Sequence, residues 1–562
     1  MSSNVRSIAL TTTVILLSAV HLMGQHTHGE DQRALQIDPF RAQAQIAPIL
    51  EGLGDDHHAI TTKLERAQLF FDQGLRLNYG FNHLEALRAF KEAVRLDPNC
   101  AMAYWGWALV LGPNLNLPMK PEVVPQAYEA IQMAMNHRDK VSEVERDYIE
   151  ALAKRYSNDP HADRAPLDLA YAKAMKAVHE KYPNDDDAAT LYAASLMDLS
   201  PWSYWYGDGQ PRERTPEILS ILEETLTRSP RHVGALHYYI HAVEAVSPKR
   251  AEAVADRLRG LTPGAGHLVH MPSHIYIQVG RYQDAFAVNV DAVKADEGYI
   301  TQCRAQGIYP LNYYPHNLHF LIWAALMQGR SQESISLARK LASRVPSDFQ
   351  GNDWALYQTF LSMPLYAMVR FGKWQEILTE PAPSPDKTYW RGIWHYARGL
   401  AYLRQSRTPL ARRELAALRA TATDRRSESM LIGFTNGARL LKIATEVLAG
   451  EIDAAGRRYD QALAHLDSAV RLQDSLTYTE PPDWYYPVRQ TLGAVLLQAG
   501  RPAEAEVVYW ADLRQYPENG YSLRGLVEAL RAQGRQDDAA TMEKRFRKAW
   551  SYADVQLNSS RF

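Results

Sequence analysis

The spacing of two Gly-Arg dipeptides near the end of the sequence strongly limits the folds that this chain can adopt. Gly500-Arg501 and Gly534-Arg535 lie 34 residues apart, and each follows one stretch of helical periodicity and precedes another. A glycine just past the last periodic residue is typical of a helix end, because glycine adopts the left-handed backbone that terminates many helices. A 34-residue period that contains two helices indicates stacked helical hairpins, each of which buries its apolar face against its neighbours.

Helical periodicity extends over most of the chain, from residue 64 to residue 554. Prolines and glycines interrupt it at intervals that become irregular in the middle of the sequence, so we expect longer loops near residues 201–214 and 296–309. A chain of 562 residues exceeds one ordinary domain, and a repeat array accommodates that length. We therefore predict an all-α fold in which helical hairpins stack into a superhelix, an α-solenoid.

Three blocks of the sequence resemble a family of exported bacterial tetratricopeptide repeat (TPR) proteins with a histidine-rich central region. They span residues 79–106 (YGFNH, then EA, then LDPNCAMAYWG), residues 266–276 and residues 480–487 (EPPDWYYP). The resemblance covers most of the chain beyond residue 24. It implies a tetratricopeptide-type right-handed superhelix whose first helices line a concave groove, and it implies no particular reaction.

Residues 1–24 have the pattern of a signal peptide. Arg6 precedes a mostly apolar stretch that ends at Met23, and the small residue Gly24 follows. The residues around this point fit cleavage poorly, so an uncleaved anchor is the alternative. We expect an exported protein in the periplasm or the extracellular space. Since no other segment reaches the roughly 18 apolar residues of a membrane-spanning helix, we expect no span after signal cleavage.

The remaining sequence divides into three predicted parts. Residues 25–60 form a flexible N-terminal segment. Residues 61–420 form a TPR-like superhelix with its histidine-rich centre at residues 237–319, and residues 421–562 form C-terminal TPR repeats.

The composition excludes several kinds of function. The net charge of −2 and the pI of about 6.8 provide no basic footprint for nucleic acid. The two cysteines, Cys100 and Cys303, allow one bridge at most, so disulfides do not organise the fold. The sequence contains no phosphate-binding loop, dinucleotide fingerprint, serine-hydrolase elbow or paired CxxC motif.

Histidines in the middle of the chain share one register relative to the predicted helix ends. Three helices are expected to end at Ser247-Pro248, at Gly280 and at Gly329. All seven histidines between residues 237 and 319, and one glutamate, lie thirteen, ten, six or three residues before these ends. They are His237, His241, Glu244, His267, His270, His274, His316 and His319. These steps keep the side chains within an arc of about 80° on each helix, so we expect one polar row along the groove.

Imidazoles that converge from neighbouring helices predict a transition-metal site, because two rings can share one ion at nitrogen–metal distances near 2 Å. A groove for an anion or substrate and a ladder of buried hydrogen bonds are the alternatives. The row contains no Lys, Arg or Asn, which an adaptor for acidic peptide ends would present there.

The types of ligand side chain narrow the choice of metal ion. Imidazole suits zinc, copper, iron and nickel, and no thiolate belongs to the row. His237, His241 and Glu244 could form the two-histidine, one-carboxylate face of a non-haem iron site. The remaining five positions are all nitrogen and favour copper or zinc. Of these metals we favour copper, with iron and zinc as alternatives.

The predicted function is a metalloprotein, and a redox metalloenzyme (an oxidase or oxygenase for a small-molecule or peptide substrate) is the hypothesis for its activity. The rivals are a metal-dependent hydrolase with Glu244 as catalytic base, a storage or delivery protein without catalysis, and a TPR scaffold that binds a peptide or protein partner. The residues leave open whether the protein is an enzyme.

Two further segments carry weaker signals. His57 and His58 lie just before the first repeat and could fold over the groove as further metal ligands, or could belong to a disordered tail. The aromatic loop at residues 201–207 could wall the site or simply pack under a neighbouring segment.

Overall fold

The computed structural model describes residues 31–303, 309–346 and 355–562, and within these ranges its regular secondary structure is almost entirely helical. Two short antiparallel strands, β1 (Leu431–Ile432) and β2 (Thr435–Asn436), form the one sheet found in the described residues. The predicted all-α, tetratricopeptide-type fold is therefore confirmed. The predicted signal peptide, residues 1–24, lies outside the described part of the chain. Of the helices that are described, none has both the length and the apolar character that crossing a membrane requires.

Contacts divide the chain into two compact units. The first comprises Met1–Ile275 and Val290–Tyr314, and the second comprises Tyr276–Asn289 and Pro315–Phe562. The boundaries expected from the sequence at residues 60 and 420 stay predictions.

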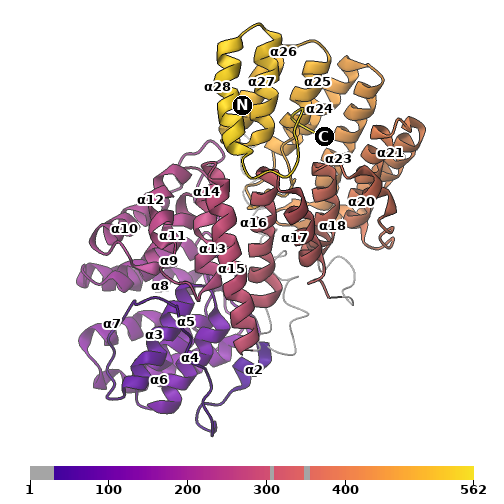
Figure 1. The fold of residues 1–562 in the computed structure, drawn as a ribbon. Coiled ribbons are helices and arrows are strands. Elements are labelled where there is room, and N and C mark those ends of the chain that lie inside the picture. The colour runs from indigo at the N-terminus through magenta and orange to yellow at the C-terminus, as the bar shows by residue number, and fades with distance from the viewer. Residues whose placement is uncertain (1–30, 304–308, 347–354) are drawn as a thin grey trace, which may run out of the picture. The chain divides into compact units, whose positions relative to one another are not determined.

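The first unit is a succession of helices in which neighbours along the chain pack as antiparallel hairpins (Figure 1). Its α-helices are α2 (Asp31–Gln36), α3 (Glu65–Tyr79), α4 (His83–Leu96), α5 (Ala101–Leu111), α6 (Val124–His137), α7 (Glu143–Ala153), α8 (Arg164–Lys181), α9 (Asp186–Asp198), α10 (Thr215–Arg228), α11 (Val233–Val243), α12 (Glu252–Leu258) and α13 (Gly266–His270), followed by most of α14 (Pro272–Gln278) and the later part of α15 (Tyr282–Cys303). Short 3-10 turns lie at Pro121–Val123, Arg138–Lys140 and Pro248–Ala251, and a π-helical turn lies at Tyr309–Tyr313.

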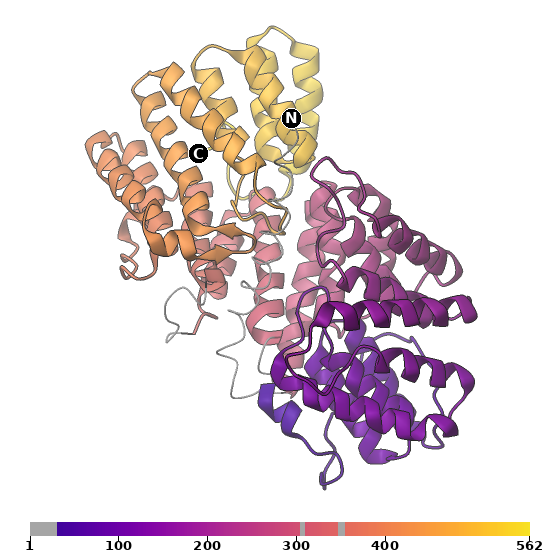
Figure 2. The ribbon, with the colours of Figure 1, turned by 180° about the vertical axis from the view of Figure 1, so that it is seen from behind.

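The second unit continues with the same kind of hairpin (Figure 2). Its helices are α16 (Tyr314–Met327), α17 (Ser331–Ala342), α18 (Ala355–Arg370), α19 (Trp374–Thr379), α20 (Thr388–Arg404), α21 (Thr408–Ala422), α22 (Arg425–Ser429), α23 (Gly437–Ala455), α24 (Tyr459–Asp474), α25 (Val488–Gln498), α26 (Pro502–Gln515), α27 (Gly520–Ala532) and α28 (Gln536–Ala549). Gly500 and Gly534, which set the 34-residue period, end α25 and α27 with φ of 72° and 78°. The predicted left-handed helix ends are therefore present.

A single aromatic ring shows why these hairpins stack closely. Phe90 of α4 lies between Gly74 of α3 and Gly106 of α5. A Cβ atom at Gly106 would lie 2.2 Å from the Phe90 ring, so only glycine allows the ring to occupy this space. Large aromatic rings that pack against glycines produce the close-packed core that stabilises a repeat array.

Two segments differ from the sequence-based expectation. The loop expected near residues 296–309 is largely helical, since α15 continues to Cys303. In this part of α15, the Tyr299 hydroxyl lies within hydrogen-bond distance of Asn82 and Glu85 at the start of α4. The N-terminal segment is packed from residue 34 onwards: the buried Nζ of Lys91 donates to the carbonyl oxygens of Ala34, Leu35 and Ile37 at 2.8–3.0 Å.

Candidate metal centre

Six of the eight predicted ligands lie together in the first unit. His237 and His241 lie on α11 and Glu244 directly follows it, while His267 and His270 lie on α13 and His274 on α14. None of the six is more than 4% exposed. We call these six residues the buried cluster. The register predicted from the sequence has therefore brought one face of each helix to the same place.

His237 and His241 turn their Nε2 atoms towards each other at 3.0 Å. The Nδ1 atom of His237 lies 2.6 Å from the backbone carbonyl oxygen of Tyr79. Because a carbonyl oxygen only accepts hydrogen bonds, Nδ1 of His237 carries the proton. The Nε2 atom of the neutral ring therefore presents a lone pair to His241. Burial, together with the charge that His241 would carry, holds the pKa of His237 well below its usual value.

Glu244 joins the two helical segments. Its Oε1 lies 3.2 Å from Nδ1 of His241, and its Oε2 lies 2.6 Å from Nδ1 of His274. As a carboxylate it accepts a proton-bearing Nδ1 from each ring and thereby directs the Nε2 atoms of both away from itself. Burial raises the pKa of Glu244, and the neighbouring His274 partly opposes that shift.

The second imidazole pair is formed by His270 and His274, whose Nε2 atoms are 2.8 Å apart. The Oγ atom of Ser273 lies 3.2 Å from Nδ1 of His270. A serine hydroxyl either donates or accepts, so this pair can share an ordinary hydrogen bond. For His237 and His241 a hydrogen bond requires a proton on Glu244, because Nε2 of His237 can only accept and Nδ1 of His241 faces that carboxylate. This pair is therefore the stronger indication of a bound cation.

Within the first unit, the donor atoms of the buried cluster form two overlapping sets. His237, His241 and His267 each offer one nitrogen, and these three atoms lie within 4.8 Å of one another. His241, Glu244 and His274 form a second such set. The grouping of His237, His241 and Glu244 expected from the sequence is not among them. Nε2 of His237 faces the side of His241 that is opposite Glu244, so the carboxylate pairs with His274 instead.

Aromatic side chains close the site. The ring of Phe81 lies 4.5 Å from His237 and 5.4 Å from His267, and Trp202 stands edge-on to His241 at 5.1 Å. Both aromatic residues have positive φ, 55° for Phe81 and 60° for Trp202, a conformation that costs about 1–2 kcal/mol for a residue with a side chain. The open groove expected from the sequence is thus covered here, and the aromatic loop at residues 201–207 forms part of the wall.

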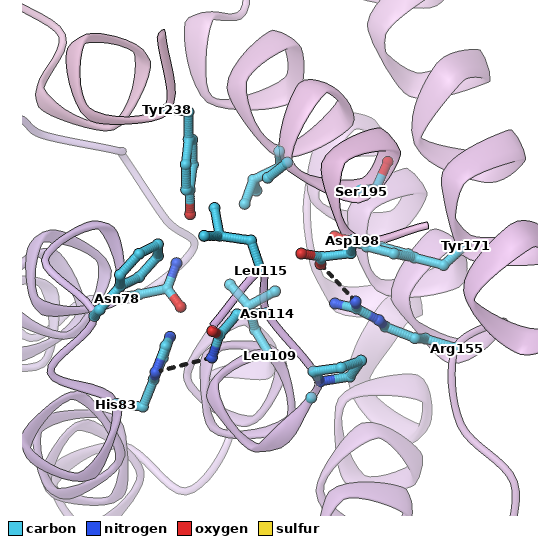
Figure 3. Close-up of a pocket in the computed structure, with 15 residues that line it drawn as sticks. Asn78, His83, Leu109, Asn114, Leu115, Arg155, Tyr171, Ser195, Asp198 and Tyr238 are labelled. Carbon is cyan, nitrogen blue, oxygen red and sulfur yellow. Dashed lines mark hydrogen bonds and ion pairs between the residues drawn. The ribbon is translucent and has the colours of Figure 1, made fainter. Parts of the chain in front are cut away.

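A small cavity lies on the other side of Phe81. Figure 3 shows its lining, where His83 approaches Asn114 and Arg155 pairs with Asp198 at 2.7 Å. Burial lowers the pKa of His83 to about 4, so this ring is neutral at physiological pH. The cavity volume of about 30 Å³ accommodates one or two water molecules and excludes a peptide.

His316 and His319 lie on α16, in the second unit. The His316 ring packs against Phe320 at 4.9 Å, and His319 stacks on Tyr485 at 5.2 Å with its ring nearly parallel. Burial lowers the pKa of His319 to about 3, and its Nε2 has no hydrogen-bond partner among the described residues. Their participation in one site with the buried cluster stays a prediction.

His57 and His58 belong to a different cluster from the histidine row. Nδ1 of His57 lies 2.8 Å from Asp72. Nδ1 of His58 lies 2.8 Å from Oδ2 of Asp187, near the start of α9, and His232 approaches Oδ1 of the same carboxylate at 3.1 Å. The N-terminal segment brings His57 to Asp72 of α3 and His58 to the acidic start of α9. Their role as further metal ligands of the row stays a prediction.

The electrostatics of this second group are the reverse of those in the buried cluster. Burial alone would lower the pKa of His58, but the hydrogen bond and negative charge of Asp187 raise it to about 9. Burial would raise the pKa of Asp187, but hydrogen bonds from His232 and His58 hold it well below its usual value.

Comparison with known proteins adds no family or reaction to this geometry. No family model matches the chain, and no curated protein matches it. Solved structures that it resembles include human IFIT1 as a dimer with m7Gppp-AAAA (11% identity, 87% of this chain and 91% of that chain, TM-score 0.30). They also include the P58(IPK) TPR domain (13%, 86% and 92%, TM-score 0.20) and the APC/C Cut9–Hcn1 hetero-tetramer (14%, 96% and 82%, TM-score 0.30). At these identities and scores the likeness carries no inference about ligand or partner.

Proposed function

We propose that this protein is a metalloprotein that binds a transition-metal ion through His237, His241 and His267. The contact between the Nε2 atoms of His237 and His241, 3.0 Å apart, carries the proposal. Two nitrogens bound to one metal at about 2 Å, with an angle of about 90–110° between them, lie about 2.9–3.4 Å apart. Each ring also has its Nδ1 directed to an acceptor, which leaves Nε2 as the ligand atom.

In the metal-free protein, a hydrogen bond can account for the short distance between the Nε2 atoms of His237 and His241. One proton on Glu244 would donate to Nδ1 of His241, whose Nε2 would then carry hydrogen and donate to His237. Burial raises the pKa of Glu244 and so favours that proton. A metal ion bound between the rings replaces it, because metal ligands must be deprotonated. Metal binding is therefore expected to release protons from the cluster.

The residues around the proposed site limit which metal it binds and which reactions it can support. A set of nitrogen ligands favours copper, followed by zinc and iron. Both oxygens of Glu244 are engaged by imidazoles, so it is a positioning residue, and this arrangement disfavours the hydrolase hypothesis in which Glu244 is the base. The neighbouring cavity of about 30 Å³ admits a molecule the size of water or dioxygen. Phe81 and Tyr238, which contact the cluster, line this cavity, but none of the proposed ligands does. A redox centre beside it would therefore be limited to a molecule of this size, and a peptide would be excluded.

Metal storage or delivery is the second candidate, and complete burial of the ligands favours it. A closed site without an open coordination position is typical of ions that are held rather than used in catalysis. Reduction of the bound copper by a mild reductant, followed by reoxidation in air, would separate the two: a redox centre cycles repeatedly, whereas a storage site releases its ion or remains unchanged.

Equilibrium dialysis of the metal-free full-length protein against Cu²⁺ tests the proposal. The double substitution His237→Ala/His241→Ala should remove one equivalent of copper per chain while circular dichroism shows unchanged helicity. Copper EPR of the wild type should show coupling to several nitrogens. His465→Ala is the matched control, since this histidine pairs with Glu446 on the surface of the second unit. The proposal fails if the double variant binds as much copper as the control.

A further inference from the structure

A second group of metal-ligand side chains lines an open cleft in the first unit. The cleft has a volume of about 490 Å³ and is formed by residues 56–59, 185–187 and 229–232. These come from the N-terminal segment, the start of α9 and the connection between α10 and α11. Unlike the cavity beside Phe81, this cleft has room for an ion together with a small molecule.

Three side chains on the cleft wall have metal-ligand spacing. His58, Asp185 and Asp187 each offer one donor atom, and these atoms lie within 4.8 Å of one another. The side chains of His58 and Asp187 are 13% and 16% exposed, so solvent reaches them. His232 caps α11 by accepting the amide of Ala235 at Nδ1, which directs its Nε2–H to Asp187.

The cleft brings carboxylates and histidines together. Its lining contains four aspartates, at positions 56, 185, 186 and 187, with Arg231 and three histidines, and Asp187 raises the pKa of two of these histidines, His58 and His232. Asp186 already has partners outside the ligand set, because Arg228 lies 2.6 Å away and Ser229 donates to it. Asp187 accepts hydrogen bonds from His58, His232 and Tyr79, and Asp185 accepts one from Tyr148, so a cation beside His58 would share these two carboxylates with their present donors.

We propose that His58, Asp185 and Asp187 form a second metal site, which takes a divalent ion of the Mn²⁺ or Fe²⁺ kind and opens to the cleft. Two carboxylates and one imidazole suit these ions better than copper. Three protein ligands leave coordination positions free, as in sites where a metal binds an external molecule. The buried cluster shares no ligand with this site, so either proposal can fail without the other.

Titration of the metal-free full-length protein with Mn²⁺ tests the site, with free Mn²⁺ followed by its EPR signal. The wild type should bind one Mn²⁺ per chain, and Asp187→Asn should weaken binding by more than about tenfold. Asp186→Asn is the matched control in the same cleft and should bind as the wild type does. The substitutions His237→Ala/His241→Ala should also leave Mn²⁺ binding unchanged.

Asp187 accepts hydrogen bonds from three side chains, so its replacement can disturb folding. Asp185→Asn keeps the test decisive, because Asn also caps a helix well and so preserves the hydrogen bond from the Ala188 amide. This variant should keep wild-type helicity and lose Mn²⁺ affinity. Wild-type affinity in Asp185→Asn, equal loss in Asp186→Asn, or no binding by the wild-type protein would each overturn the proposal.

Discussion

The buried cluster and the cleft of the first unit place the same side chain in opposite electrostatic settings. Burial and mutual repulsion hold the pKa of His237 and His241 well below the usual histidine value. In the cleft, Asp187 raises the pKa of His58 to about 9. The rings of His237 and His241 remain neutral and offer lone pairs, whereas His58 holds a proton beside Asp187 and would have to release it to bind a metal ion. The side chains that neighbour each histidine therefore determine which metal ion each region suits.

Tyr79 connects the two regions. Its hydroxyl donates to Asp187 at 2.5 Å, and its carbonyl accepts from His237 at 2.6 Å. Gly234 makes this possible, because the Tyr79 ring occupies the space where a side chain on α11 would lie. The absence of a histidine at this position of the register thus has a structural reason.

The largest effect is expected in the buried region. Glu244→Ala leaves Nδ1 of His241 and Nδ1 of His274 without their acceptor inside the protein, which should lower the unfolding free energy by about 2–4 kcal/mol. Glu223→Ala is the control, since Glu223 bonds Tyr239 and Arg250 near the surface and should cost less than about 1 kcal/mol. Urea unfolding of the metal-free proteins measures both. Equal stability of the two variants would show that Glu244 does not hold the cluster.

The pH dependence of stability should have opposite signs in the two regions. The raised pKa of His58 gives a contribution that is complete below about pH 6.5, its value when unfolded, and is lost as the pH rises towards 9. The lowered pKa of His241 gives a contribution that is present above about pH 6.5 and is lost as the pH falls. Each slope is at most about 1.4 kcal/mol per pH unit.

Urea unfolding of the metal-free wild type, His58→Gln and His241→Gln between pH 5 and pH 9 checks these signs. The stability difference between wild type and His58→Gln should shrink with rising pH, and the difference for His241→Gln should shrink with falling pH. If the stability differences of both variants changed in the same direction with pH, the two regions would not have opposite electrostatic settings.

Gly234→Ala should affect both regions at once. The added Cβ would lie 2.6 Å from the Tyr79 ring, and overpacking of this kind costs about 1–3 kcal/mol. Displacement of Tyr79 should weaken copper binding and Mn²⁺ binding together. Gly207→Ala is the control, because no atom lies within 4 Å of a Cβ built there. If only one metal affinity changes, Tyr79 is not the shared support.

Tyr79→Phe should have the smallest effect and separate the regions. It removes the hydroxyl bond to Asp187 and keeps the carbonyl that accepts from His237, so the unfolding free energy should fall by about 0.5–1.5 kcal/mol. Mn²⁺ affinity should weaken severalfold, and copper affinity should stay at the wild-type value. Dialysis with each metal in turn measures this difference.

The sequence predicts what depends on local spacing and misses what depends on distant partners. The 34-residue period identifies the helix ends at Gly500 and Gly534, and the register of α11, α13 and α14 identifies the six residues that form the buried cluster. The spacing of residues on α11 cannot predict that His237 donates to the Tyr79 carbonyl, because Tyr79 lies in a hairpin far earlier in the chain.

The same limit applies to the contacts of Glu244 and His58. Glu244 lies three residues after His241 and looks like a ligand beside it, but its shorter hydrogen bond joins His274 on another helix. His58 lies 129 residues from Asp187, and only the packed N-terminal segment brings them together. Phe81 could have been suspected from its position in the distinctive block at residues 79–83, although that block does not show which rings it contacts.

X-ray absorption at the copper edge tests the central claim most directly. The sample is full-length Asp185→Asn, loaded with one equivalent of Cu²⁺, so that the cleft does not compete. We expect about three imidazole nitrogens at about 2 Å from copper, with the outer-shell scattering of their rings, and loss of that scattering when His237→Ala/His241→Ala is added. A copper shell of oxygen atoms without imidazole scattering, or an unchanged spectrum in that background, would contradict it.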